Sequence, residues 1–325
     1  MPHKATIVIR CYNEEDNIGQ LLHGILQQTV RDVEIIVVDS GSTDATLSIA
    51  SRFPVKIINI KPQDFSFGHS LNAGCRAANS EFIINASAHV YPVYKNWVKC
   101  LLAPLADPEV ALVYGKQRGY KNSQFSEHQI FAKWFPDKSN PNQDHPFCNN
   151  ANASIRHEIW KQLPYNEDLT GLEDIDWAQR AMALGLRIVY DANAEVEHVH
   201  NETPLQIYNR YRREAIALKR ILPNEHFHFG DFIYLFLTNV LSDYVDALHK
   251  ALFWQNWERI PRFRLMQFLG TYRGFTQRGL LTSRIKQTFY YPNQNRRQKK
   301  SVQPQKSQEM LVDYQPWERS YHEDH

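Results

Sequence analysis

Short apolar runs alternate with amphipathic helical segments over the first 115 residues of the chain. In segment 18–26 the apolar residues recur at i, i+3, i+4, i+7 and i+8, which is typical of a helix with one buried face. The predicted strands are 5–9, 33–38, 55–60, 82–84 and 110–114. Because these runs are almost continuously apolar, they favour a sheet that is covered on both faces. The alternation predicts an α/β fold with a doubly wound, mostly parallel sheet.

The carboxyl ends of the predicted strands carry polar residues. Arg10, Asp39 and the stretch after Ile84 all lie at such ends. Ligands of open α/β sheets bind beyond the carboxyl ends of the strands. We therefore expect the functional site at this edge of the sheet.

The composition excludes several classes of protein. Apolar residues make up 43% and charged residues 22% of the 325 residues, which excludes disorder over the whole length. The 37 basic and 35 acidic residues leave a net charge of +2, so we expect no nucleic-acid partner. The four cysteines are scattered and form no CxxC pair, which excludes a zinc ribbon and indicates a reducing compartment.

Neither a secretory signal nor a membrane span is predicted. The N-terminus has no basic segment followed by an apolar one. The longest apolar run, 232–241, is far shorter than the roughly 20 residues that cross a bilayer. We expect a cytoplasmic protein.

The chain is predicted to have three parts. Residues 1–225 carry the α/β pattern, with a long polar loop over 116–146 that holds one helix. Residues 226–292 are rich in aromatic residues and arginine and are expected to form a helical subdomain. Residues 293–325 begin with a polar, low-complexity run and are expected to be a flexible tail.

Two polar loops follow the first two predicted strands. One begins at Arg10 and includes Tyr12, Asn13 and Glu14. The other begins at Asp39, which can accept hydrogen bonds from a ribose or a base. The structural alternative for both loops is a capped helix start.

Three carboxylates, Glu173, Asp174 and Asp176, lie at the start of a predicted helix. One of them would be a general base if it lies close to a substrate hydroxyl. The alternative is simple compensation of the helix dipole.

Three histidines follow predicted strands. His89 lies after segment 82–84, and His198 and His200 lie two residues apart, on one face if the strand is regular. Histidines that gather in this way are candidate metal ligands. The alternative is a set of half-buried polar side chains.

Taken in order, these motifs resemble the family 2 glycosyltransferases, which are inverting enzymes with a GT-A fold. The matching stretches are 7–15, 36–44 and 150–156, followed by Glu173-Asp174 with Trp177 and Arg180 and then by His198. The resemblance covers about residues 4–220.

The resemblance implies a role for each matching residue. Asp174 would deprotonate the acceptor hydroxyl, and Glu173 would bind the acceptor or orient the site. The donor side would comprise Arg10, Tyr12, Asn13, Glu14, Asp39, Ser40, His69, Asn72 and Ser87. The acceptor side would comprise Asn150, Asn152 and Trp177. His198 would be a metal or diphosphate contact, with His200 as the alternate.

The chain departs from the family at the metal-binding Asp-x-Asp, where Ser87 and His89 occupy the two acidic positions. Either His89 and His198 still bind a divalent metal, Mn²⁺ or Mg²⁺, or the site works without metal. The Ser-Ala-His form, with segment 67–72 before it, is similar to a rhamnosyltransferase-like subgroup.

The implied reaction moves a sugar from a nucleotide-sugar donor to a hydroxyl of a glycan or lipid-linked acceptor, with inversion, in bacterial polysaccharide, capsule or lipopolysaccharide synthesis. Arg210, Arg212 and Arg213 are candidates for the diphosphate, and a solvated charged face is their alternative. A catalytically idle relative that binds nucleotide sugars is the competing hypothesis, motivated by the missing Asp-x-Asp. A dehydrogenase is disfavoured because GxGxxG is absent.

The aromatic, arginine-rich stretch 232–278 has two interpretations. It is either a helical subdomain packed on the core or a peripheral membrane contact at the inner face of the membrane. The sequence does not set the oligomeric state.

Overall fold

The computed structural model describes residues 3–277, 311–315 and 317. Within them, eight strands form one sheet in the order β3-β2-β1-β4-β7-β6-β8-β5. The strands are β1 (Ala5–Cys11), β2 (Val33–Asp39), β3 (Lys56–Asn59), β4 (Phe82–Ser87), β5 (Val90–Pro92), β6 (Val110–Gly119), β7 (Asn152–Arg156) and β8 (Arg187–His198). The helices that cover the sheet are α1 (Ile18–Leu26), α2 (Thr46–Ala50), α3 (Phe67–Ala77), α4 (Trp97–Leu102), α5 (Phe125–Trp134), α6 (His157–Gln162) and α7 (Glu173–Ala183), with short 3-10 turns at Pro62–Asp64 and Ala103–Ala106.

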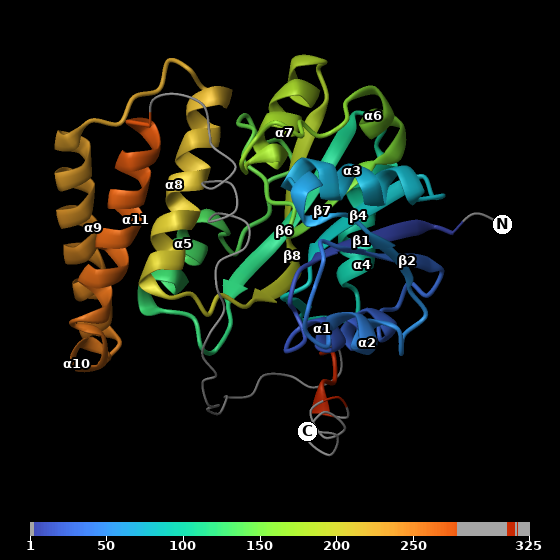
Figure 1. Cartoon of the computed structure of the whole chain (residues 1–325), viewed down its shortest axis with the longest axis horizontal. Coiled ribbons are helices and arrows are strands. Elements are labelled where there is room, and N and C mark those ends of the chain that lie inside the picture. The colour runs from blue at the N-terminus through green and yellow to red at the C-terminus, as the bar shows by residue number, and fades with distance from the viewer. Residues whose placement is uncertain (1–2, 278–310, 316, 318–325) are drawn as a thin grey trace.

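The sheet has an apolar cluster on each face. Neighbouring residues of β1 point to opposite faces, so Ile7 and Ile9 join one cluster while Val8 joins the other. Helices α1, α2 and α4 cover the first face, and α3, α6 and α7 cover the second (Figure 1). The α/β class with a mostly parallel sheet is confirmed.

Three of the strand pairings are antiparallel, which the sequence pattern did not predict. Strand β7 runs against both β4 and β6, and β5 runs against β8. The chain leaves β6 at its carboxyl end, passes through α5 and re-enters as β7 at the same edge. A parallel pairing would need a crossover to the opposite edge. An apolar strand looks the same in either direction, so only the connection decides.

A helical layer stands beside β6 and β8 (Figure 1). It comprises α8 (Pro204–Ile221), α9 (Phe229–His249), α10 (Phe253–Asn256) and α11 (Arg259–Phe275). Helix α8 lies so close to α11 that a Cβ on Gly270 would come within 2.5 Å of the Tyr208 carbonyl oxygen. Asp243 and Arg264 form a buried, two-pronged ion pair between α9 and α11, with both N–O distances 2.8 Å. Helix α8 therefore packs with the C-terminal helices as well as with the sheet domain.

The described part of the C-terminus lies against the sheet domain. The amide of Val312 donates to the carbonyl of Val93 at 3.1 Å, and the Tyr314 hydroxyl donates to the carbonyl of Pro92 at 2.8 Å. The sequence predicted a flexible tail over 293–325, but the described residues 311–315 of that tail are bound to the sheet domain. Residues 293–310, 316 and 318–325 lie outside the described residues, as do 278–292 of the predicted helical subdomain.

Candidate active site

The predicted edge of the sheet gathers the polar strand ends. Arg10 on β1 pairs in register with Ser87 on β4, and Cys11 pairs with Asp39 on β2. The ends of β6 and β8 also pair, at Gly119 and His198. The strand register therefore places several predicted site residues along one edge, with the loops that follow them.

The loops after β1 and β2 are bound to each other. Asn13 adopts the left-handed region with φ of 53°. Its side-chain oxygen accepts from the Thr43 amide at 2.8 Å, and its own amide donates to the Ser42 hydroxyl at 2.9 Å. The helix after this loop begins at Ile18, so Asn13 fastens two loops and is not a helix cap.

The Asp39 carboxylate is satisfied by its own loop. It accepts from the amides of Gly41 at 2.9 Å and Ser42 at 3.0 Å, and the Ser42 hydroxyl donates to its other oxygen. Asp39 and Ser40 are both buried. The Asp39 carboxylate therefore stabilises the turn. A hydrogen bond from a bound nucleotide sugar would come in addition to these contacts.

The catalytic carboxylates predicted from the sequence lie at the start of α7. Leu172 precedes the helix with φ of 56°, which turns the chain sharply into Glu173 and Asp174. Asp174 accepts from the amides of Asn150 at 3.1 Å and Ile175 at 2.9 Å. Glu173 lies 3.4 Å from the Arg10 guanidinium.

Burial and the neighbouring Glu173 charge raise the pKa of Asp174 to about 7, against the opposing hydrogen bonds from the two amides. A carboxylate with this pKa is matched to proton transfer at neutral pH. Asp176, two residues further along, instead pairs with Arg180 at 2.9 Å. The structure therefore separates Asp174 from the third carboxylate of the cluster.

Asn150 links the carboxylates to β4. Its side-chain nitrogen lies 3.5 Å from Glu173, and its side-chain oxygen lies 3.3 Å from both the Asn85 amide nitrogen and the Tyr165 hydroxyl. Sequence reasoning missed Asn85 and Tyr165. The available signal was that Asn85 is a polar residue near the end of a strand. Its partners Asn150 and Tyr165 lie far away in the chain, so the sequence alone does not connect them.

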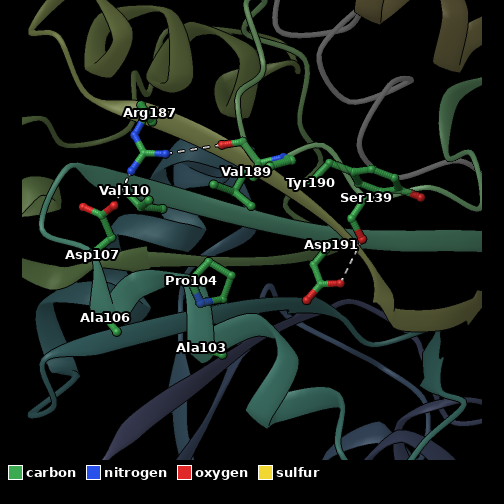
Figure 2. Close-up of a pocket in the computed structure, with 11 residues that line it drawn as sticks. Ala103, Pro104, Ala106, Asp107, Val110, Ser139, Arg187, Val189, Tyr190 and Asp191 are labelled. Atoms are coloured by element: carbon green, nitrogen blue, oxygen red, sulfur yellow. Dashed lines mark hydrogen bonds and ion pairs between the residues drawn. The ribbon is translucent and has the colours of Figure 1, made fainter.

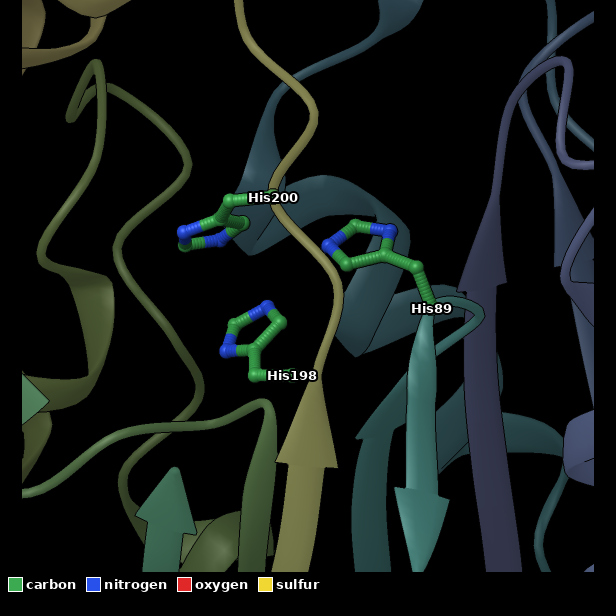
Figure 3. A group of neighbouring side chains, drawn as sticks. All are labelled: His89, His198 and His200. Atoms are coloured by element: carbon green, nitrogen blue, oxygen red, sulfur yellow. The ribbon is translucent and has the colours of Figure 1, made fainter. Parts of the chain in front are cut away.

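The three predicted histidines form one cluster, although they come from different strands. The ring centroids of His89 and His198 are 5.0 Å apart, and those of His198 and His200 are 4.1 Å apart. One ligand nitrogen from each ring lies within 4.8 Å of the others. Figure 3 shows one ring nitrogen of each histidine facing the space between the three rings.

Each histidine also binds a second group through Nδ1. His89 contacts the Glu14 carboxylate at 2.7 Å, His198 the Gln117 side-chain oxygen at 2.7 Å and His200 the Glu127 carboxylate at 2.6 Å. Glu14 was expected to contact the nucleotide-sugar donor, but in the structure its carboxylate contacts His89 and Asn17. Gln117 and Glu127 were not predicted.

Two carboxylates beside the cluster share one guanidinium. Arg210 on α8 contacts Glu127 at 2.8 Å and Glu202 at 2.6 Å. Burial would raise the pKa of Glu127, but His200 and Arg210 outweigh it and lower that pKa to about 2. Burial and the neighbouring His200 and His89 hold the pKa of His198 well below its usual range.

Two cationic side chains stack on one aromatic ring beside the carboxylates. The guanidinium carbons of Arg10 and Arg213 lie 5.0 Å and 4.5 Å from the centroid of the Phe67 ring. Gly171 approaches Arg213 as well, since a Cβ there would lie 3.6 Å from the Arg213 Nε. Arg213 and Phe67 therefore belong to the surroundings of Glu173.

Some predicted site residues lie in structural positions. His69 and Asn72 both bind Glu167, at 2.8 Å each, and so tie α3 to the segment before α7. Asn152 is buried and bonds Trp97 at 2.8 Å. Trp177 is 0% exposed, so its ring supports α7 from the core and does not line an acceptor site.

A surface cavity of about 470 Å³ lies elsewhere, at the start of β6 and β8 (Figure 2). Asp107, Val110, Arg187 and Tyr190 are among its lining residues. Because His198 lies at the far end of the same strand as Arg187, this cavity is at the opposite end of the sheet from the site. Its Arg187 is already paired with Asp107.

A sequence profile described as Glycosyl transferase family 2 matches residues 6–163. The O-antigen chain rhamnosyltransferase RfbN of Salmonella typhimurium is 29% identical over 221 residues, which cover 64% of this chain and 70% of that protein. The O-antigen chain rhamnosyltransferase WbaN of Salmonella anatum is 29% identical over 218 residues, covering 63% and 69%.

The fold is similar to that of the mannosyltransferase PcManGT from Pyrobaculum calidifontis, solved in complex with GDP-Man and Mn²⁺. The TM-score is 0.55 at 18% identity, and the match covers 83% of this chain and 87% of that one. This similarity confirms the GT-A fold. The profile match over residues 6–163, the two relatives and the fold agree with the order of motifs along the edge of the sheet, and together they support a family 2 glycosyltransferase.

Proposed function

We propose that the protein transfers a hexosyl-type sugar from a nucleotide-sugar donor to an acceptor hydroxyl with inversion, in the synthesis of a bacterial surface polysaccharide. The buried Asp174, with its raised pKa, is the observation that carries this proposal. The names of the relatives RfbN and WbaN support an O-antigen-like acceptor and rhamnose as the first sugar to test.

In the proposed reaction the acceptor oxygen attacks the anomeric carbon while the bond from that carbon to the diphosphate oxygen breaks. The electron pair of the broken bond leaves with the nucleoside diphosphate, and Asp174 takes the acceptor proton. Amides of Asn150 and Ile175 orient the carboxylate for this transfer. Holding both substrates in line contributes several kcal/mol, on the order of 7 or more in well-oriented systems.

The donor would lie along the edge between the two fastened loops and the histidine cluster. Tyr12, Asn13 and Asp39 are the proposed contacts of the base and ribose, because their loop is pre-organised by its own hydrogen bonds. Arg10 is the proposed contact of the diphosphate, since it lies at the end of β1 between Ser87 and Glu173.

The resemblance implies a Mg²⁺ or Mn²⁺ ion at this edge of the sheet. Mg²⁺ prefers oxygen ligands, and Mn²⁺ binds imidazole more weakly than later metals do. In the place of Asp-x-Asp the chain has Ser87 and His89, and the ligand atoms that converge with that of His89 belong to two more imidazoles. This donor set fits Mg²⁺ poorly, so the proposed chemistry rests on the side chains named above.

The test is sugar transfer measured with a panel of UDP-, GDP-, dTDP- and CMP-sugars and lipid-linked or glycan acceptors. The Asp174→Asn variant should lose turnover by about 10²–10⁴-fold while still binding the nucleotide. Asp176→Asn, on the same turn of α7 but paired with Arg180, is the matched control and should retain turnover. Nucleotide-sugar binding without transfer by the unmodified protein would favour the idle relative.

We also propose that α9 contacts a membrane surface. Its exposed face carries an apolar stripe made of Ile233, Tyr234, Leu237, Leu241, Val245 and Leu248, and Trp254 beyond its end is 84% exposed. The sequence after α11 is basic, with Arg296, Arg297, Lys299 and Lys300 in close succession, which suits anionic lipids. Among the described residues no helix is long and apolar enough to cross a bilayer.

Co-sedimentation with vesicles tests the membrane proposal. The full chain should pellet with anionic vesicles and less with zwitterionic ones. Replacing Leu237 and Leu241 by serine should release it, whereas exchanging two exposed polar neighbours of the stripe, by Thr238→Ser with Ser242→Thr, should not. A chain that does not pellet with either kind of vesicle and forms dimers in solution would contradict the proposal.

A further inference from the structure

We infer that His89, His198 and His200 form a three-imidazole site for one late first-row divalent cation of the Zn²⁺ or Co²⁺ class, in preference to Mg²⁺. The three rings face one another at the carboxyl edge of the sheet (Figure 3). The inference deepens the proposed function, because a cation held there would lie where the family's acidic pair is missing.

The Nδ1 contacts set the tautomers of the rings. The partners of His89 and His200 are the carboxylates Glu14 and Glu127, which only accept hydrogen bonds, so each Nδ1 donates. His198 donates in the same way to the side-chain oxygen of Gln117. In the neutral rings, Nε2 then carries the lone pair, which is the form that binds a metal.

This pattern is the one that metal-ligating histidines show in proteins. Their second nitrogen donates to a carboxylate or carbonyl oxygen, which fixes the ring and strengthens the ligand. All three rings have such a partner, and the three partners come from different elements: the loop after β1, the strand β6 and the helix α5.

His198 provides an independent observation. It is 6% exposed, and its Nε2 is buried without a hydrogen-bond partner within the described part of the chain. A buried polar atom is rarely left unsatisfied unless an ion or water completes it. The atom that lacks a partner is the nitrogen that the Nδ1 contact leaves available as a ligand.

The distances suit a tetrahedral ion after small side-chain rotations. A Zn–N bond of about 2.0–2.1 Å places the ligands of such an ion about 3.4 Å apart. The present ligand atoms lie within 4.8 Å of one another. The short pairing of β5 with β8, at Val90 and His198, holds His89 close to the other two rings.

The local charge also suits a cation. Glu14, Glu127 and Glu202 surround the cluster, against the guanidinium of Arg210. Three neutral imidazoles favour the later metals of the Irving–Williams order over Mg²⁺. Three protein ligands leave a fourth position open, which a phosphate oxygen of the proposed donor would fill.

The test uses the full chain, freed of metal by chelation and then titrated with Co²⁺, Zn²⁺ or Mg²⁺. We expect one Co²⁺ per chain with the visible absorption of a tetrahedral nitrogen site, displaced by Zn²⁺ and not by a similar concentration of Mg²⁺. His89→Ala should weaken the binding at least about tenfold, and Gln117→Leu, which removes only the His198 partner, about 10–100-fold. His226→Ala, an exposed histidine outside the cluster, is the matched control.

The wild-type titration alone decides the inference if a variant fails to fold. A featureless Co²⁺ titration, equal affinity for Mg²⁺, or unchanged Co²⁺ binding in folded His89→Ala would overturn it. Full sugar transfer by metal-free protein would overturn the role at the donor while leaving the proposed function intact. Tight Co²⁺ binding by a protein that transfers no sugar would support the metal site and contradict the proposed function.

Discussion

Replacing Asp174 by asparagine should lower turnover by about 10²–10⁴-fold and at the same time stabilise the fold. The pKa of Asp174 is raised from 3.8 to about 7 by burial and by Glu173, so the folded state disfavours its charged form. A raised pKa means that stability is highest at low pH and is lost as pH rises from 3.8 toward 7. Above pH 7 that loss is complete, at about 4 kcal/mol.

Asparagine has the same shape and no charge, so it escapes this loss. Its amide group cannot accept from both backbone donors, Asn150 and Ile175, and one lost hydrogen bond costs about 1–2 kcal/mol. The net gain should therefore be about 2 kcal/mol at pH 8. At pH 5 the wild-type loss is only about 2 kcal/mol, so the gain should fall to about zero.

Urea unfolding of both proteins at pH 5 and pH 8 measures this difference, and the slope with urea should not change. Asp176→Asn is the control, because it removes the carboxylate charge that pairs with Arg180, and no gain at pH 8 is expected. If Asp174→Asn is less stable than wild type at pH 8, or if its effect is the same at both pH values, the buried carboxylate does not carry the charge penalty derived above.

Three further outcomes are expected. The kcat/KM for sugar transfer should rise about tenfold per pH unit below pH 7 and level off above it, because the proposed base Asp174 must be deprotonated to accept the proton; a flat profile from pH 5.5 to 8 would contradict this. Asn13→Ala should lower the unfolding free energy by about 2 kcal/mol and weaken nucleotide binding, since it loses the bond to Thr43 and strains a positive φ; Asn13→Gly should recover part of the stability. Asp243→Asn should cost about 3–5 kcal/mol in urea unfolding, because it leaves the buried Arg264 uncompensated; a cost below about 1 kcal/mol would show that water reaches the pair.

The candidate site was predictable where one short segment carries the signal. Glu173 and Asp174 follow a break in the chain and begin a helix, and the histidines follow strand ends. The spacing of residues along the helix did not by itself distinguish Asp174 from Asp176 as the candidate base. The two side chains point to different sides of α7, and only the fold shows that one is buried beside Asn150 while the other reaches Arg180.

The groups that complete the site come from far along the chain. His89 and Glu14 are 75 residues apart, and His200 and Glu127 are 73 apart. No local pattern marks Gln117 or Glu127 as partners of a histidine. Asn152 and Trp177 show the converse, because a motif residue can serve the core and not the substrate.

By itself, the sequence determined the kinds and order of the elements and the edge of the sheet along which the polar strand ends lie. Periodicity and strand propensity act over a few residues, so they are legible in the chain. The tertiary structure decided the direction of β7 and β5, the docking of residues 311–315 and the burial that raises the pKa of Asp174. The strand directions follow from how the chain connects one strand to the next. The docked segment and the raised pKa depend on which distant groups exclude water from one another, and that is settled only when the chain has packed.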